Sequence, residues 1–187
     1  MPPKVKITKE DVVNAALEIV RTVGTDALNA RMIASFLNCS TQPVFSNFET
    51  MDELRIAVVK TANDLFSEYL KREIKLGEFP PYKASGMAYI RFAKEEKELF
   101  KLLYMRDRAG EDFEEDISIN DQMESIVRTN TGLDSDRSKL FHLEMWAFVH
   151  GVAAMLATGF IDLDRELVSK MITDSYQGLK KQYEVEG

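Results

Sequence analysis

Apolar residues recur at helical spacing through most of the 187-residue chain, and the period-two alternation of half-buried strands is nearly absent. Between Thr8 and Gly24, for example, apolar side chains fall at i, i+3, i+4 and i+7. This periodicity predicts an all-α protein of about nine helices. The composition is 45% hydrophobic and 29% charged, which is ordinary for a globular chain with a sizeable core.

Capping residues mark where several helices begin and end. Thr8 with Asp11 resembles a capping box, and Gly24 ends that first helix. Thr50 with Glu53 forms a second capping box, ahead of a long helix that runs to about residue 76. The stretch "GEFPPY" then breaks the chain, and later helices are expected near residues 83–94, 96–106, 116–130, 135–158 and 164–183.

Two short helices lie between the first helix and the long one. Asn29 is expected to cap the earlier helix, and Asn38 suits its left-handed end. Ser40 is expected to cap the later helix, with Pro43 in its first turn. Two short helices joined by the tight link "NCS" form a helix-turn-helix, whose second helix can read base edges in the DNA major groove.

The second short helix carries small polar and amide side chains suited to nucleic acid. Gln42 is the strongest candidate for base reading, because its amide can both donate to and accept from adenine. The pattern alone leaves an alternative open, since helical hairpins without DNA function are common. The candidate DNA-binding residues are Lys6, Arg31, Ser40, Thr41, Gln42, Pro43, Phe45, Ser46, Asn47 and Thr50.

The net charge of −7 would usually argue against a nucleic-acid partner. Residues 1–50, however, hold five basic and five acidic side chains, so the negative excess lies entirely beyond residue 50. Lys4, Lys6 and Lys9 form a short basic arm at the start. A solvated tail explains this arm equally well.

The N-terminal stretch resembles the TetR family of transcriptional regulators. The segments "ITKEDVVNAALEIV", "ARMIASFLNCSTQPVFSNF" and "ETMDELRIAVV" follow one another in the family's order over roughly the first 55 residues. The resemblance implies binding to double-stranded operator DNA. Two positions depart from the family, which usually has tyrosine at Phe45 and lysine at Met51, and neither replacement can donate a hydrogen bond to a phosphate.

The helix expected at 135–158 has a bulky apolar face and a stripe of small residues. Small residues at this spacing allow another helix to approach closely, either within the chain or from a second copy. The element "MWAFVHG" resembles one found in some TetR C-terminal domains, and the resemblance implies a homodimer formed by the last two long helices. The expected interface residues are Ala147, Gly151, Ala154, Thr158, Met171 and Ser175.

The resemblance also implies a pocket for a small-molecule effector that is largely apolar. Methionine and aromatic side chains line ligand pockets, although they line ordinary cores as well. The candidate residues are Met87, Tyr89, Phe92, Phe100, Leu103, Tyr104, Met105, Met123, Trp146 and His150. The expected organisation is a helix-turn-helix domain at residues 1–52 and an effector-binding and dimerisation domain at residues 53–187.

Enzyme, metal and membrane functions have little support in the sequence. Cys39 is the only cysteine, and His142, Glu144 and His150 lack the partners that would complete a metal site. No phosphate-binding glycine loop or nucleophile motif occurs, so no cofactor and no catalysis are expected, and the acidic run "EDFEED" is interpreted as a solvated loop. No apolar run approaches the roughly 20 residues of a membrane span, which favours a cytoplasmic protein. We therefore expect a dimeric TetR-like repressor, the alternative being a helical ligand-binding dimer that has lost specific DNA binding.

Overall fold

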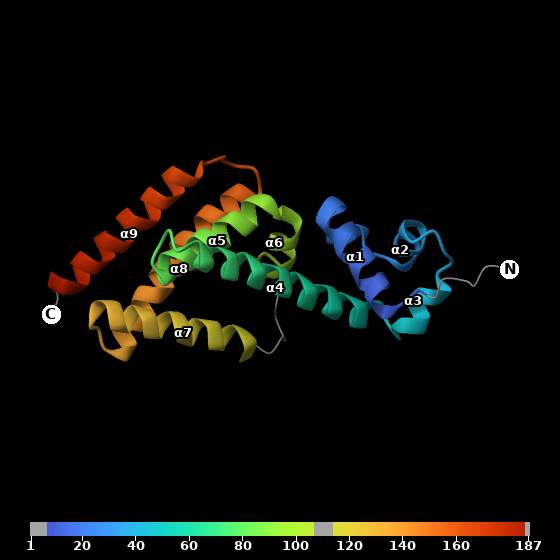
Figure 1. Ribbon diagram of the computed structural model, residues 1–187, viewed down its shortest axis with the longest axis horizontal. Helices are drawn as coiled ribbons and strands as arrows, with labels where there is room; N and C mark the ends of the chain where they lie inside the picture. The colour runs from blue at the N-terminus through green and yellow to red at the C-terminus, as the bar shows by residue number, and fades with distance from the viewer. Residues whose placement is uncertain (1–6, 107–113, 186–187) are drawn as a thin grey trace. The chain divides into compact units, whose positions relative to one another are not determined.

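The computed structural model describes residues 7–106 and 114–185, and the side chains of residues 7–106 and 123–183 (Figure 1). All regular elements of these ranges are helices, which confirms the predicted all-α fold. They are α1 (Lys9–Val23), a 3-10 turn (Thr25–Ala27), α2 (Ala30–Phe36), α3 (Gln42–Asn47), α4 (Met51–Leu76), α5 (Pro81–Glu95), α6 (Lys97–Tyr104), α7 (Glu114–Thr131), α8 (Ser135–Ala157) and α9 (Arg165–Val185).

The capping box predicted for α1 is present. The Thr8 hydroxyl accepts from the Asp11 N–H at 3.1 Å, and the Asp11 carboxylate accepts from the Thr8 N–H at 2.8 Å. Gly24 ends the helix with φ 91°, in the left-handed region where a side chain is strained. A Cβ built there would lie 3.1 Å from a carboxylate oxygen of Glu98 on α6, so a larger residue would also require the Glu98 side chain to shift slightly.

The caps of α2 are confirmed, whereas the cap predicted for α3 is wrong. Asn29 accepts from the first backbone amides of α2, and Asn38 has φ 50°. Helix α3 begins only at Gln42, with Thr41 in the capping position and no side-chain cap bond. A cap at Ser40 would bond an N–H two or three positions later, and the later of these belongs to Pro43, which has none.

Helix α4 begins as predicted in one respect and differs in another. The Thr50 hydroxyl accepts from the Glu53 N–H at 3.1 Å, as in a capping box. The Glu53 carboxylate, however, accepts from the N–H of Glu49 at 2.9 Å, one residue before the expected partner. The helix ends at Leu76, and the predicted break follows before α5 begins at Pro81.

The chain divides into two compact units. The first contains the described residues up to Ser67 together with Glu96–Arg106, and the second contains Glu68–Glu95 together with the described residues from 114 onward. Helix α4 contributes to both units, because its first 17 residues belong to one and the rest to the other. The functional division between residues 52 and 53 stays a prediction.

In the first unit, α1 contacts α2, α3 and α6. Its apolar stripe is fully buried at Val12, Ala16 and Val20, and Ile33 of α2 is buried too. Helix α6 adds Leu99 and Phe100, both without exposed surface. The helix-turn-helix is therefore held on a core to which α6, more than 40 residues further along the chain, also belongs.

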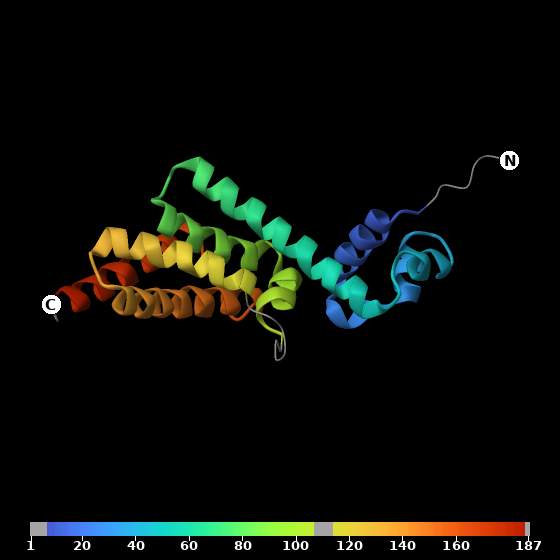
Figure 2. The same ribbon diagram turned by 90° about the horizontal axis from the view of Figure 1, so that it is seen from below.

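In the second unit, α8 is the central helix. It contacts α5, α7 and α9, and Figure 2 shows α7 and α8 side by side. Phe92 of α5 and Phe141 of α8 are completely buried. The predicted bulky face of α8 therefore points inward, as its apolar spacing indicates.

Helix α8 comes nearer to a membrane-spanning helix than the sequence reading anticipated. Within the described part of the chain it is the one helix long and apolar enough to cross a membrane, with a mean hydropathy of 1.4 over 18 residues. Of that window, 39% is buried by the protein. The core helix of a globular protein can have the same length and apolar composition.

Candidate nucleic-acid interface and effector region

Helix α3 is fixed by one face and exposed on the other. Val44 and Phe48 are 1% and 2% exposed and attach the helix to the core of the first unit. Gln42, Phe45 and Ser46 lie on the outer surface, at the i, i+3 and i+4 positions of one face. The structure therefore presents a rigidly held short helix with a three-residue outer face.

Two of the polar side chains predicted to meet DNA are bonded within the protein. The Ser46 hydroxyl donates to the Gln42 carbonyl at 2.8 Å. The Asn47 amide donates to the Pro43 carbonyl at 2.8 Å and to the Ile7 carbonyl at 3.4 Å. Because these donors are used locally, the exposed Gln42 remains the side chain of α3 predicted to read bases.

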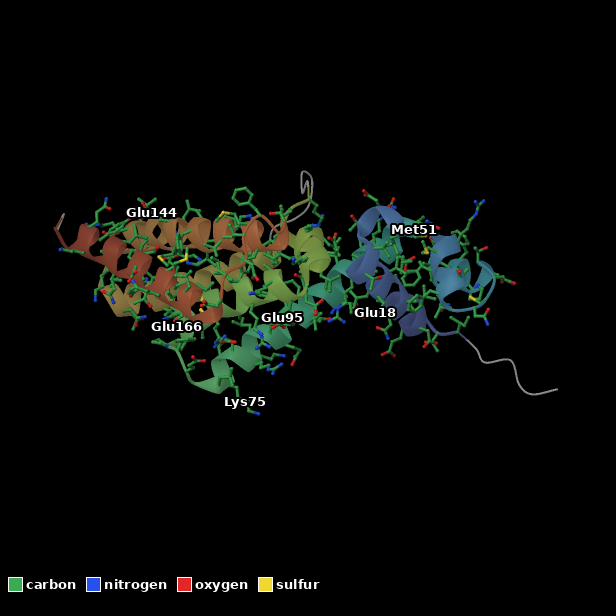
Figure 3. The ribbon with its side chains drawn as sticks, turned by 90° about the horizontal axis from the view of Figure 1, so that it is seen from above. Glu18, Met51, Lys75, Glu95, Glu144 and Glu166 are labelled. Carbon is green, nitrogen blue, oxygen red and sulfur yellow. The ribbon has the colours of Figure 1, made fainter. Side chains whose placement is uncertain are left out.

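The beginning of α4 offers less to a phosphate than a free helix N-terminus does. The Thr50 hydroxyl already accepts from the Glu53 N–H, and the Glu53 carboxylate accepts from the Glu49 N–H. Asp52 and Glu53 put two carboxylates in the first turn. Met51, labelled in Figure 3, opens the helix where the family usually has lysine. Negative charge at this end stabilises the helix through its dipole but repels a phosphate group.

The cationic candidates differ in their surroundings. Lys9 donates to Glu53 at 2.9 Å, and its ammonium lies 4.5 Å from the centre of the Phe48 ring. This hydrogen bond is the largest cause of the lowered pKa of Glu53. Arg31, on α2, is exposed, as are Ser40 and Thr50. Lys6 lies outside the described residues.

The predicted dimer stripe lies on the outer side of the second unit. Ala147 and Thr158 are exposed, and Gly151, Ala154, Met171 and Ser175 are half-buried. A Cβ added at Gly151 would meet no atom within 4 Å. Larger apolar side chains flank the stripe, since Leu140 and Leu143 of α8 are 50% and 57% exposed.

The predicted effector residues are divided between the two units. Phe100, Leu103, Tyr104 and Met105 belong to the first unit, and the other six belong to the second. Within these groups, five are core side chains, whereas Met105 and Trp146 are exposed and Tyr104, Met123 and His150 are half-buried. The five buried ones are Met87, Tyr89, Phe92, Phe100 and Leu103.

His150 lies between two aromatic side chains. Its Nδ1 is 2.9 Å from the Tyr89 hydroxyl, and its ring stacks on Trp146 with centroids 5.0 Å apart. Burial lowers the pKa of His150, so the neutral ring is favoured. The structural or pocket role expected for this histidine fits these contacts, and no group of three metal-ligating side chains occurs among the described residues.

A cavity of about 460 Å³ opens in the second unit, beside α4, α5, α8 and α9. Of the predicted effector residues, only Met87 lines it. Its lining includes the ion pair of Arg91 with Glu95 at 2.8 Å, and Glu95 is labelled in Figure 3. The remaining lining is Leu76, Glu78, Ile90, Lys94, Leu156, Leu163, Asp164, Arg165 and Val168.

Sequence reasoning missed this cavity and the buried charge beside it. Glu73 of α4 is 1% exposed and pairs with Arg165 of α9, while Arg91 lies 3.8 Å from its second oxygen. The apolar positions were visible in the helical periodicity. The sequence did not show which helices pack together, because paired residues such as Glu73 and Arg165 are far apart in the chain.

A helix-turn-helix held on a small helical core, joined by α4 to a larger helical unit, defines the class of all-α DNA-binding regulators. Residues 82–175, half of the chain, match the family described as "Tetracyclin repressor-like, C-terminal domain". The chain therefore belongs to the tetracycline-repressor-like (TetR) family of transcriptional regulators. A search of curated protein sequences finds no match.

Solved structures share the whole fold at low sequence identity. A TetR-like transcriptional regulator from Rhodococcus sp. RHA1 is 16% identical, with a TM-score of 0.72 over 96% of this chain and 98% of its own. The multidrug binding protein EbrR complexed with malachite green is 15% identical, with a TM-score of 0.61 over 92% and 98%. A putative TetR-family regulator from Mesorhizobium loti MAFF303099 is 15% identical, with a TM-score of 0.57 over 91% and 94%.

Proposed function

We propose that this regulator is a repressor that binds a pseudo-palindromic operator as a homodimer and is released by a small-molecule effector. The observation that carries the proposal is the anchoring of α3, where buried Val44 and Phe48 hold Gln42 and Phe45 on the outer face. A helix fixed in this way can enter a major groove without losing much conformational entropy. The proposed repressor acts in the cytoplasm, and its function requires no catalytic step.

The proposed homodimer supplies the second recognition helix that a twofold operator requires. Twofold operators require two recognition helices about 34–36 Å apart, and a symmetric dimer provides them. The small stripe on α8 and the neighbouring leucines Leu140 and Leu143 support this dimer, because an exposed apolar helix face is stabilised when a partner covers it. Helix α9 contributes Met171 and Ser175 to the proposed interface.

The effector is proposed to bind the second unit. EbrR has been crystallised with imidazole, malachite green and ethidium, which supports a small organic ligand for a protein of the same fold. The Tyr89, Trp146 and His150 cluster offers aromatic surface with hydrogen-bonding tips, as ligand pockets do. Ligand binding weakens operator binding only by its differential affinity for the two states, about 1–3 kcal/mol in typical cases.

A second candidate is a ligand-binding dimer without specific DNA recognition. Phe45, Met51 and the acidic first turn of α4 favour it, because each removes a phosphate contact or adds repulsion. Gel shifts with the DNA flanking the gene separate the two functions. Binding that survives excess competitor DNA at physiological salt supports the repressor, and binding that competitor DNA removes completely supports the alternative.

A further inference from the structure

Phe45 is an exposed aromatic side chain on the face that would enter the groove. It is 55% exposed, although the neighbouring Val44 of the same helix is buried. A phenyl ring has no N–H or O–H, so it cannot replace the phosphate contact of the tyrosine usual in the family. In the proposed operator complex its ring can therefore offer DNA an apolar contact and no hydrogen bond.

The major groove offers one apolar partner for this contact. Base edges there present hydrogen-bond donors and acceptors, and the C5-methyl group of thymine is the apolar exception. From this we infer that Phe45 reads thymine, packing its ring on the C5-methyl group. The inference rests on the proposed operator binding and assigns one base preference within it.

The spacing on α3 adds a geometric expectation. Gln42 and Phe45 are i and i+3 on one helix face, so their Cβ atoms lie about 5–6 Å apart. Base pairs are about 3.4 Å apart along one strand. Each half-site should therefore hold an adenine for Gln42 and, one or two base pairs away, a thymine for Phe45.

The other outward groups of α3 do not compete for this role. Ser46 turns its hydroxyl onto the Gln42 carbonyl, and Asn47 turns its amide onto the Pro43 carbonyl. On this helix, the Gln42 amide and the Phe45 ring are therefore the two groups expected to discriminate between bases. An operator read in this way is expected to be rich in A·T pairs at its half-site centres.

The test compares thymine with uracil, which keeps the same hydrogen-bonding groups and lacks the methyl group. The full-length protein first selects duplexes from a random-sequence pool, and the selected operator is then synthesised with uracil at each thymine in turn. Loss of one buried methyl group should weaken binding about fourfold, and loss in both half-sites about 15-fold. The effect should occur at one thymine per half-site.

Two variants show whether Phe45 is responsible. Phe45→Ala should bind the thymine and uracil duplexes equally. Phe36→Ala is the matched control, since Phe36 is 58% exposed in the same unit but lies on α2, and it should keep the full preference for thymine. Thermal unfolding should be unchanged in both variants because both rings are exposed.

The outcomes are distinguishable. Specific binding whose affinity does not change with uracil would overturn the role of Phe45. The same follows if uracil lowers the affinity of the natural protein and of Phe45→Ala equally. Either result leaves the repressor function standing. Absence of any selected sequence overturns both. A second selection, from a pool with uracil in place of thymine, needs no variant: the preference for A·T at the Phe45 position should disappear while the Gln42 position keeps its adenine.

Discussion

Arg21 on α1 holds the carboxylate of Glu96, the residue between α5 and α6, through two hydrogen bonds. Nε donates to Oε2 at 2.6 Å, and Nη2 donates to Oε1. Glu96 is 4% exposed, whereas Arg21 is 41% exposed. Because both residues lie in the first unit, the start of α6 is fixed to the helix that supports the helix-turn-helix.

Replacing Arg21 by alanine should destabilise the first unit. The buried carboxylate of Glu96 would lose two charge-assisted hydrogen bonds, at a cost of about 1–3 kcal/mol. For a chain of this size each kcal/mol lowers Tm by about 2–4 °C. Circular dichroism during thermal unfolding measures the shift.

The matched control for this change is Glu18→Ala. Glu18 is the other carboxylate bonded to Arg21, at 3.2 Å, and is 43% exposed. Because solvent screens an exposed pair, its loss should change stability by less than about 0.5 kcal/mol. Equal Tm values for the two variants would show that burial of Glu96 does not strengthen its pair with Arg21.

Gln42→Ala should reduce sequence discrimination and leave the fold intact. The substitution removes the amide of the proposed bidentate contact with adenine, and such a contact is worth about 1–3 kcal/mol against the wrong base. Competition binding between the operator and a duplex altered at one base pair measures the ratio. An unchanged ratio would remove Gln42 from the residues that read bases.

The neighbouring variant Ser46→Ala is expected to behave differently. Its hydroxyl already donates to the Gln42 carbonyl, so its loss frees no group that faced the DNA. Operator affinity and discrimination should both stay close to those of the natural protein. A loss as large as that of Gln42→Ala would mean that the hydroxyl turns outward when DNA binds.

The local structure was largely predictable because it depends on neighbouring residues. Thr8, Asp11 and Asn29 act as caps as expected, since a cap joins groups only two or three positions apart. The beginning of α3 differs from the prediction for a local reason as well, because Pro43, expected in the first turn, lacks the N–H that a cap at Ser40 would bond.

The long-range structure was not predictable in the same way. The pairing of Glu73 with Arg165 depends on how α4, α5 and α9 pack, which periodicity does not encode. The pocket residues were predicted from residue type, and residue type does not tell that Phe92 is buried and Trp146 exposed. The small stripe on α8 reaches the surface at Ala147 and Thr158, because its spacing complements that of the bulky face, and its part in a dimer stays a prediction.

Gly151→Leu should weaken the proposed dimer without harming the monomer. No atom lies within 4 Å of a Cβ built at Gly151, so the chain itself has room for a larger side chain. A leucine there would keep two α8 helices apart, and a misfit costing about 1–3 kcal/mol raises the dimer Kd about 5- to 150-fold. Sedimentation velocity over a range of concentrations measures this.

The matched control for the interface is Gln177→Leu. Gln177 is exposed on α9, about 200° around the helix from Ser175 at 100° per residue, so its side chain points away from the proposed interface. Its variant should remain as dimeric as the natural protein. If Gly151→Leu also leaves the dimer unchanged, the stripe on α8 is not the interface.

The two histidines of α8 should make the stability of the fold depend on pH. The Nδ1 atoms of His142 and His150 lie 3.0 and 2.9 Å from the hydroxyls of Tyr82 and Tyr89 on α5. Burial is the largest cause of the lowered pKa of each, from an ordinary value of 6.5. For His142 the negative charge of Glu124 opposes this lowering in part.

A lowered folded-state pKa means that the unfolded chain takes up protons first as the pH falls. Stability should therefore be constant above about pH 7 and decline through 6.5 toward the folded-state pKa. Carboxylates titrate lower, so Tm measured from about pH 7.5 to 5.5 isolates the histidines. In the His142→Gln, His150→Gln double variant the slope of Tm against pH in this window should flatten, whatever its absolute Tm. A slope equal to that of the natural protein would assign the pH dependence to other groups.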